Sequence, residues 1–317
     1  MKIVITGAGG FVGPHLMREL CAAGHHVVAI DRSTIPDIPG GNITGVRMDL
    51  NDRLAMYDLF AAERPDAVLH AAGWSHVGKS WENPPSVFEA NVLNTIWLYQ
   101  TACEFLPKDG LFLYVSSADI LGAVPADQMP ITEKHQPNPR SPYAVSKYSA
   151  EMILRVLESN GGTRVIVARP FNHIGPGQSP GFVCPSFARQ IAEIETGQRD
   201  FLLHGNLTTK RDFLDVRDVA RAYRMLLEKK PADPLFIIAS GESHSIQSIV
   251  EMMFEIAGIS PRMKSDPALF RPADISEFRG SPALLTARTG WKPEIPLQQS
   301  LRDLLDDARA RVQLAKS

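Results

Sequence analysis

Short apolar runs alternate with helix-forming segments through the first half of the chain. The runs are Lys2 to Thr6, His26 to Ile30, Ala67 to His70, Leu111 to Ser116 and Arg164 to Ala168. Each run is nearly all apolar and free of internal proline, which is typical of strands that helices cover on both faces. The alternation predicts βαβ units, and hence an α/β fold with a doubly wound parallel sheet.

The pattern changes after Arg169. Proline and glycine concentrate in PFNHIGPGQSPGF, a helical pattern follows from about Cys184 to Glu195, and a hairpin is expected near Phe201 to Phe213. This change indicates an inserted lobe that binds substrate.

Two later segments return to the sheet. DVRDVARAYRMLLEKK predicts an amphipathic helix that begins at Asp215 or Asp218, and PLFIIAS predicts a strand that rejoins the sheet. We therefore expect a first domain of residues 1–171 plus 213–240. A smaller C-terminal substrate-binding lobe would comprise residues 172–212 and 241–317.

A glycine turn follows the first predicted strand. KIVIT runs into GAGGFVG, and the helical pattern HLMRELCAAG comes immediately after. Glycine permits a positive φ and a close approach of the backbone to a pyrophosphate, which then lies on the N-terminus of the helix. A turn without a ligand would use the same spacing, but the context favours the dinucleotide site of a Rossmann-type domain. We expect the cofactor to contact Gly7, Gly10, Phe11, Val12 and Gly13.

An acidic residue ends the second predicted strand, HVVAI. Asp31 lies where a carboxylate accepts hydrogen bonds from the adenosine ribose hydroxyls. A carboxylate repels a 2′-phosphate, which favours NAD(H), whereas Arg32 beside it suits the 2′-phosphate of NADP(H). The sequence leaves both NAD(H) and NADP(H) open as the cofactor.

Two further segments are expected beside the cofactor. Asp49 and Leu50 follow ITGVRMDL, which has the pattern of a third strand, and we expect them to border the adenine. The next strand ends in HAAG, where His70 is either a core histidine or a ligand. Small side chains leave room for the cofactor backbone at Ala71, Ala72 and Gly73.

A tyrosine and a lysine supply candidate catalytic groups. Tyr143 and Lys147 occur in SPYAVSK, where we expect Ser141 to cap a helix and Pro142 to be its first residue. The four-residue spacing places both side chains on one helical face. A tyrosine has an ordinary pKa of about 10, so we expect the Lys147 ammonium to lower the pKa of Tyr143 and to hold the nicotinamide ribose.

The strand LFLYVSSADI lies upstream and places Ser117 at a strand end, on the functional edge of the sheet. Ser117 either hydrogen-bonds the reacting oxygen beside Tyr143 or merely terminates the strand. The glycine turn, Asp31, HAAG, Ser117 and the tyrosine-lysine helix occur in one order on elements of the expected type. Together they predict an oxidoreductase.

The composition limits the classes of binding partner that we expect. The 33 Lys and Arg and 35 Asp and Glu are scattered and give a net charge of -2, so neither a nucleic acid nor a membrane is expected as a partner. The three cysteines, Cys21, Cys103 and Cys184, match no zinc spacing or disulfide framework, and we expect no metal. MKIVITGAGG has no signal-peptide pattern and no apolar run is long enough to span a membrane, so we expect a cytoplasmic protein.

The ordered motifs TGAGGFVG, HAAG, VSSADILG, YAVSK and ARPFNHIGPGQ resemble the extended short-chain dehydrogenase/reductase superfamily over nearly the whole chain. SHV after HAAG, RPFNHIGPGQ, KRDFLDVRDV and GWKPEI look most like the GDP-4-keto-6-deoxy-D-mannose reductases, which form GDP-D-rhamnose. The GDP-mannose 4,6-dehydratases are the next most similar group.

The resemblance implies that the second lobe holds a nucleotide diphosphate, with Asn172, Arg211 and Arg271 at matching positions. Arginine suits this task because its guanidinium pairs phosphate oxygens bidentately, although a lone surface arginine is usually only solvated. Pro170 is an implied cofactor contact. Other implied substrate contacts are Ser75, His76, Val77, Ser117, Val183 and Arg189.

Residues 117 to 120, SADI, separate the two groups. A dehydratase similar to this chain would carry Thr and Glu where Ser117 and Asp119 stand, and its Glu would abstract the C5 proton. Asp is one methylene shorter, and a general base must be within hydrogen-bond reach of the proton, so Asp119 favours the reductase without excluding the dehydratase.

The expected reaction is NAD(P)H-dependent reduction of the C4 ketone of GDP-4-keto-6-deoxy-D-mannose, with Tyr143 as proton donor, Ser117 orienting the oxygen and Asp119 nearby. A dehydratase or an epimerase that recycles its cofactor is the alternative. The C4 stereochemistry and the base stay open. The resemblance implies a homodimer that pairs through the Tyr143 helix and the helix before it, and the run from Val92 to Cys103 is apolar enough to be buried there.

Overall fold

The computed structural model of the chain describes residues 1–270 and 275–314. Seven parallel strands form the main sheet in the order β11-β6-β5-β4-β1-β2-β3. Their bounds are β1 Lys2–Thr6, β2 His26–Asp31, β3 Ile43–Arg47, β4 Ala67–His70, β5 Leu111–Val115, β6 Arg164–Pro170 and β11 Leu235–Ile238. The strand order reverses between β1 and β4, which is the point where ligands bind in doubly wound sheets.

The register of the strands brings the expected site residues to one edge. Thr6 pairs with both Ile30 and His70, His70 pairs with Tyr114, and Val115 pairs with Ala168. The carboxyl ends of β1, β2, β4, β5 and β6 therefore lie side by side, and each is followed by a segment predicted to bind cofactor or substrate.

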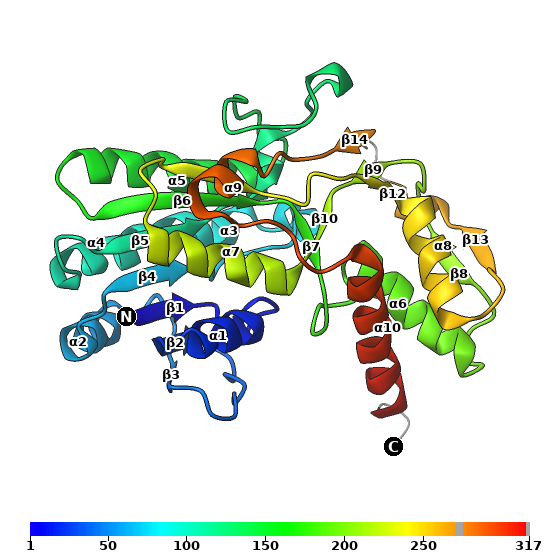
Figure 1. Cartoon of the computed structure of the whole chain (residues 1–317), viewed down its shortest axis with the longest axis horizontal. Helices are drawn as coiled ribbons and strands as arrows, with labels where there is room; N and C mark the ends of the chain where they lie inside the picture. The colour runs from blue at the N-terminus through cyan, green and yellow to red at the C-terminus, as the bar shows by residue number, and fades with distance from the viewer. Residues whose placement is uncertain (271–274, 315–317) are drawn as a thin grey trace.

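Helices cover both faces of the sheet, as Figure 1 shows. One face packs against α1 (Gly13–Ala22), α7 (Val216–Lys229) and α9 (Ala283–Thr289), and the other against α2 (Arg53–Glu63), α4 (Asn94–Phe105) and α5 (Pro142–Ser159). Apolar strand residues on both faces are fully buried, as the continuous apolar runs predicted. The α/β fold with a doubly wound, Rossmann-type parallel sheet is confirmed.

A second core belongs to the C-terminal lobe, on the right in Figure 1. It lies between α6 (Val183–Glu195), α8 (Ile246–Ala257) and α10 (Leu297–Leu314). Two short strands, β7 (Asn172–Ile174) and β10 (Phe213–Asp215), pair in parallel and connect this lobe to the main sheet. Asp215 caps α7 by accepting a hydrogen bond from the Arg217 amide, as one of the two predicted starts requires.

Two details differ from the prediction. Residues 201–213 form no hairpin, because β8 (Leu202–His204) pairs with β13 (Met263–Ser265), and β9 (Lys210–Arg211) pairs with β12 (His244–Ser245) and β14 (Glu277–Phe278). The partners are distant in sequence, so no local pattern could reveal them. In addition, Leu285 and Trp291 belong to the core that covers the sheet, although the expected boundary placed them in the lobe.

Membrane spans were searched for in the described part of the chain. No helix within residues 1–270 and 275–314 is long and apolar enough to cross a bilayer.

Candidate active site

The glycine turn is tightly packed against the end of β4. Gly7 has a φ of 81°, and a Cβ there would lie 2.8 Å from the Ala72 amide nitrogen. A Cβ on Gly13 would lie 2.1 Å from the Ala8 carbonyl oxygen, so α1 can begin against this turn only if position 13 is glycine. Gly10 closes the turn by donating to the Gly7 carbonyl at 3.1 Å.

The two other predicted members of the turn face different surroundings. Val12 packs against the core beneath the sheet, whereas the Phe11 ring stacks on His173 of β7, with centroids 5.8 Å apart and an interplanar angle of 4°. The glycine turn therefore touches the connection to the second lobe directly.

Asp31 lies at the end of β2 and is already hydrogen-bonded within the turn. Its carboxylate accepts from the Gly9 amide at 2.9 Å and from the Ser33 amide and hydroxyl at 2.8 and 2.6 Å. Arg32 accepts from Arg47 Nε through its backbone carbonyl at 3.1 Å, and its own side chain is exposed. A carboxylate and an exposed guanidinium therefore lie together where the adenosine ribose is expected.

Asp49 and Leu50 follow β3, as expected. The Asp49 carboxylate accepts from the Asn51 amide at 2.9 Å, and Leu50 packs against the core on the α2 side. Pro170 is the buried last residue of β6, at the same edge of the sheet.

His70 is a core histidine. Its ring is fully buried and hydrogen-bonds Thr6 at 2.7 Å through Nδ1 and Thr95 at 2.9 Å through Nε2. Burial, assisted by the charge of Lys147, lowers its pKa to about 3, so the ring is neutral at physiological pH. The Thr6 hydroxyl also accepts from the Ala72 amide at 3.2 Å, and this bond fixes the backbone of HAAG.

Helix α5 carries Tyr143 and Lys147 to the carboxyl end of β5. Ser141 caps the helix by accepting from the Ala144 amide, and Pro142 is the first helical residue, as predicted. Lys147 is only 5% exposed, and its Nζ donates to the Val115 carbonyl at 2.9 Å. Burial lowers the pKa of Lys147 to about 8, although the carboxylate of Glu151 opposes this change.

Ser117 and Tyr143 form the expected pair. The Ser117 hydroxyl lies close enough to the Tyr143 hydroxyl to lower its pKa, and it accepts from the Asp119 amide at 3.1 Å. Burial and the nearby Asp119 carboxylate raise the pKa of Tyr143 above its ordinary value, and Ser117 only partly offsets them.

The expected lowering of the Tyr143 pKa by Lys147 is therefore wrong for the protein alone. The pKa of Lys147 is about 8, which is lower than the raised pKa of Tyr143. As the pH rises, the Lys147 ammonium therefore loses its proton before the Tyr143 phenol does. Tyr143 is consequently a neutral phenol at physiological pH, which is the form that donates a proton.

A buried polar network supports this constellation, and no local sequence pattern predicted it. Asn91 lies in a π-helical turn, Glu89–Leu93, and its side chain accepts from the Trp74 amide at 2.7 Å and donates to the Ser146 hydroxyl at 2.9 Å. Ser146 in turn donates to the Tyr143 carbonyl at 2.7 Å. A Cβ on Gly73 would lie 2.5 Å from the Asn91 side-chain oxygen, so this network requires glycine there. Such π turns often occur at functional sites.

The predicted substrate residues after HAAG meet the second lobe. The His76 ring lies 5.5 Å from that of Phe182, and its carbonyl accepts from Trp74 Nε1 at 3.0 Å. Val183 begins α6 next to Phe182 and is 39% exposed. Ser75 is exposed and Val77 half-buried in the same loop. The predicted residues of the His76 loop and Val183 at the start of α6 therefore lie near one another.

The predicted phosphate ligands are more dispersed. Asn172 is exposed and donates to the Asp212 carbonyl at 3.3 Å, and Arg211 is half-buried on β9, donating to the Ile275 carbonyl at 2.7 Å. Arg189 lies on α6 with its guanidinium 3.7 Å from Glu193. Arg271 lies outside the described residues.

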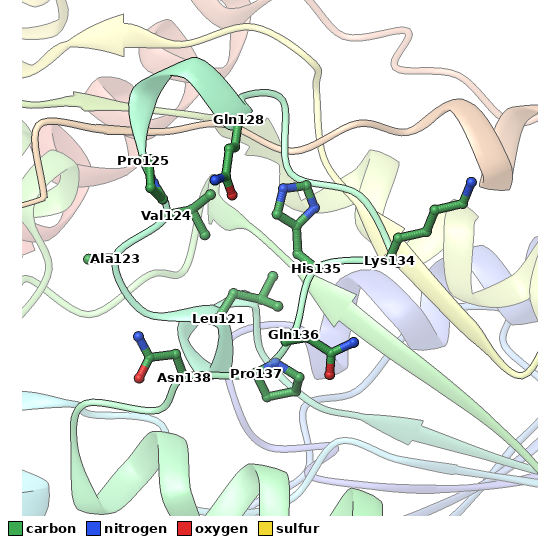
Figure 2. A pocket seen from close by; sticks show the side chains of 10 residues that line it. All are labelled: Leu121, Ala123, Val124, Pro125, Gln128, Lys134, His135, Gln136, Pro137 and Asn138. Carbon is green, nitrogen blue, oxygen red and sulfur yellow. The ribbon is translucent and has the colours of Figure 1, made fainter.

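A hollow of about 490 Å³ lies away from these residues. It is lined by the segment between the end of β5 and α5, from Leu121 to Asn138. Figure 2 shows these side chains along that loop, with Lys134 extending away from it. No predicted site residue lines it.

The residues present fit a nicotinamide dinucleotide. Backbone without side chains at Gly7 and Gly73, the N-terminus of α1 and a buried ammonium at Lys147 match a pyrophosphate and a nicotinamide ribose. Together with the Ser117 and Tyr143 pair, the fold and the site define an oxidoreductase of the extended short-chain dehydrogenase/reductase type.

The family can be stated more closely. Residues 4–304 match the family model of GDP-mannose 4,6 dehydratase, and the chain belongs to that family. It is 42% identical to a GDP-6-deoxy-D-mannose reductase from Pseudomonas aeruginosa, with 98% of each chain covered. It is 28% identical to a GDP-mannose 4,6-dehydratase from Vibrio cholerae, with 99% of this chain and 96% of the relative covered.

Solved structures agree with this assignment. The RMD protein from Pseudomonas aeruginosa, solved in complex with NADPH, superposes with a TM-score of 0.86 at 39% identity and covers 98% of this chain and 99% of its own. A UDP-glucose 4-epimerase from Thermus thermophilus in complex with NAD gives a TM-score of 0.86 at 28% identity, with 98% and 99% covered. The structural relatives thus bind either nicotinamide cofactor.

Proposed function

We propose that the protein reduces the C4 ketone of GDP-4-keto-6-deoxy-D-mannose with NAD(P)H and forms GDP-D-rhamnose. The observation that carries the proposal is the buried Tyr143 hydroxyl beside the buried Ser117 hydroxyl at the end of β5, where burial raises the pKa of the phenol and so keeps it protonated. The identity shared with the Pseudomonas aeruginosa reductase supports the substrate.

The chemistry divides between cofactor and protein. The reduced nicotinamide, when bound, supplies the hydride that the carbonyl carbon receives. Ser117 donates a hydrogen bond to the carbonyl oxygen, and Tyr143 gives that oxygen its proton as the carbon-oxygen double bond becomes a single bond. The charge of Lys147 stabilises the phenolate that remains on Tyr143, which then regains a proton from solvent.

Remote contacts would position the sugar. We assign the nucleotide diphosphate to Asn172 and Arg211, with Val183 and Arg189 on α6 and the loop of Ser75, His76 and Val77 closing around the sugar. The contact between His76 and Phe182 supports this assignment, because it already joins the two sides. Binding energy from the diphosphate would hold the ketone against the hydride donor.

The alternative is a 4,6-dehydratase. Asp119 follows Ser117 by two residues, and its carboxylate is close enough to raise the pKa of Tyr143. Asp119 thereby helps to keep Tyr143 in the protonated form from which ketone reduction starts. The argument against the dehydratase is the length of the aspartate side chain, because a general base must reach the proton that it removes.

A single assay separates the two functions. The purified protein is supplied with GDP-4-keto-6-deoxy-D-mannose and either NADH or NADPH, and cofactor oxidation and the product configuration are followed. The proposal expects stoichiometric oxidation and a rhamno product. Water loss from GDP-mannose without net cofactor consumption would establish the dehydratase instead.

We also propose a homodimer that pairs through α4 and α5. Val145, Met152 and Val156 are 38, 49 and 50% exposed. Their spacings place Met152 and Val156 each within about 20° of Val145 around α5, and about 40° from each other. An exposed apolar stripe of this kind is typical of an interface between subunits. Light scattering at micromolar concentration should give twice the mass of the chain, and a monomer would contradict the proposal.

A further inference from the structure

A buried ion pair joins α5 to β6 directly behind the active site. Arg169 Nε and Nη2 donate to the two carboxylate oxygens of Glu151 at 3.0 and 2.6 Å, and both side chains are only 6% exposed. Neither residue was singled out by any motif, although Arg169 directly precedes Pro170 at the edge that carries the site.

A buried ion pair of this kind adds little to the stability of the fold. Removing two charges from water costs several kcal/mol per ion, and apolar residues of similar volume often replace such pairs at no loss. Its retention in the interior suggests a role for the charge itself.

Glu151 lies one helical turn beyond Lys147, and Lys147 one turn beyond Tyr143. Four-residue spacing puts the three side chains along one face of α5. The Glu151 carboxylate acts directly on Lys147, since it raises the pKa of that ammonium against the effect of burial.

We propose that Glu151, held by Arg169, is a positioning residue of the active site that acts through Lys147. The Glu151 carboxylate keeps the Lys147 side chain protonated in a buried site that would otherwise favour its neutral amine. Arg169 holds that carboxylate in place. Lys147 can then hold the ribose and stabilise the Tyr143 phenolate, as the proposed function requires.

The other groups around Lys147 do not supply this charge. His70 on β4 is neutral, because burial lowers its pKa. The Tyr114 ring of β5 lies 5.2 Å from Lys147 Nζ, and burial raises the pKa of its hydroxyl. Tyr143 is a neutral phenol, and Asp119 acts on Tyr143. Of the described groups that affect the Lys147 pKa, Glu151 is the carboxylate.

The ion pair also borders a hollow. Glu151 and Arg169 line a hollow of about 250 Å³ that also borders Tyr148, Met152 and Glu133. None of the described residues that we assign to cofactor or substrate lines it.

The direct test is a titration of Lys147 in the cofactor-free protein. Lysine is labelled with ¹³C at Cε, the Lys147 signal is assigned with Lys147→Met, and its shift is followed from pH 6 to 10. The midpoint is expected near 8 in the wild type. Glu151→Gln should lower it by about one pH unit or more, as the loss of a close opposite charge does.

Matched variants separate charge from folding. Glu158→Gln removes a carboxylate from the same helix, where it pairs with Arg155 at 3.1 Å, and should leave the Lys147 midpoint unchanged. The double variant Glu151→Leu/Arg169→Met replaces the ion pair with apolar groups, so it should stay folded and still lower the midpoint. An unchanged midpoint in the double variant overturns the proposal, as does an unchanged midpoint in a folded Glu151→Gln.

Activity supplies a second readout, which rests on the proposed function. The alkaline limb of the kcat profile for ketone reduction should move to lower pH in Glu151→Gln and return in Glu151→Asp. A uniform loss at every pH would indicate a structural role only. If the wild type fails to reduce the GDP-4-keto sugar at all, the proposed function fails, while the NMR titration still decides the role of Glu151.

Discussion

Lys147 should be costly to the stability of the protein, and replacing it should show this. Its pKa falls from an ordinary 10.5 to about 8 in the folded chain. At 1.36 kcal/mol per pKa unit, the folded state disfavours the charged form by about 3 kcal/mol. Lys147→Met keeps an unbranched side chain, one atom shorter, and removes the charge. It also removes the bond to the Val115 carbonyl, which offsets roughly 1 kcal/mol.

The expected net gain at pH 7 is therefore about 2 kcal/mol, or a rise of a few degrees in Tm for a chain of this size. Because the folded pKa lies below the unfolded one, the unfolded state binds more protons between about pH 8 and 10.5. The penalty on the wild type is fully present below pH 8 and is relieved as the pH rises through that window.

Thermal unfolding of Lys147→Met and the wild type at pH 7 and at pH 10 measures this difference. The advantage of the variant should shrink toward zero or reverse at pH 10, and ketone reduction should be lost at every pH. A variant that is less stable than the wild type at pH 7, or a difference that does not depend on pH, would refute the reasoning.

Three further outcomes follow from the site. Tyr143→Phe should lower kcat for ketone reduction by about 10²- to 10⁴-fold, the usual contribution of a general acid, with an unchanged circular dichroism spectrum. Gly13→Ala places a Cβ 2.1 Å from a backbone carbonyl and should lower the free energy of unfolding by at least about 1 to 3 kcal/mol in urea. In the control Gly24→Ala the Cβ meets no atom within 4 Å, so only the positive φ of that residue is destabilising. Arg32→Glu should raise the Kd of NADPH roughly tenfold more than that of NADH, because it removes a partner for the 2′-phosphate. Equal changes for both cofactors in a binding titration would exclude that role.

The local patterns were sufficient where one segment determines its own structure. The apolar runs identified the strands, and the Ser141 cap and Pro142 identified the start of α5. The glycine turn was also recognisable, because its packing against Ala72 leaves no alternative to glycine at position 7. The order of these motifs along the chain then identified the family.

Features formed by segments that are distant in the chain could not be predicted from the sequence. Asn91 belongs to the site through Trp74 and Ser146, which are 17 and 55 residues away in the chain. The pairing of β9 with β12 and β14 is equally non-local. The pKa of Tyr143 depends on its burial and on Asp119, and the four-residue spacing to Lys147 gave no measure of either.

The electrostatic arrangement sets the protonation state from which the reaction starts. Reduction of a ketone consumes a proton from Tyr143, and burial together with Asp119 keeps that proton in place before hydride transfer. The same two effects disfavour the phenolate that reduction leaves, so a nearby cation must stabilise it. Lys147 becomes important only once the phenolate has formed, and for this it must still be charged near neutrality. Asp119 and Glu151 therefore act at two stages of one proton transfer. Asp119 keeps the Tyr143 phenol protonated before the transfer, and Glu151 keeps Lys147 positively charged so that it stabilises the Tyr143 phenolate afterwards.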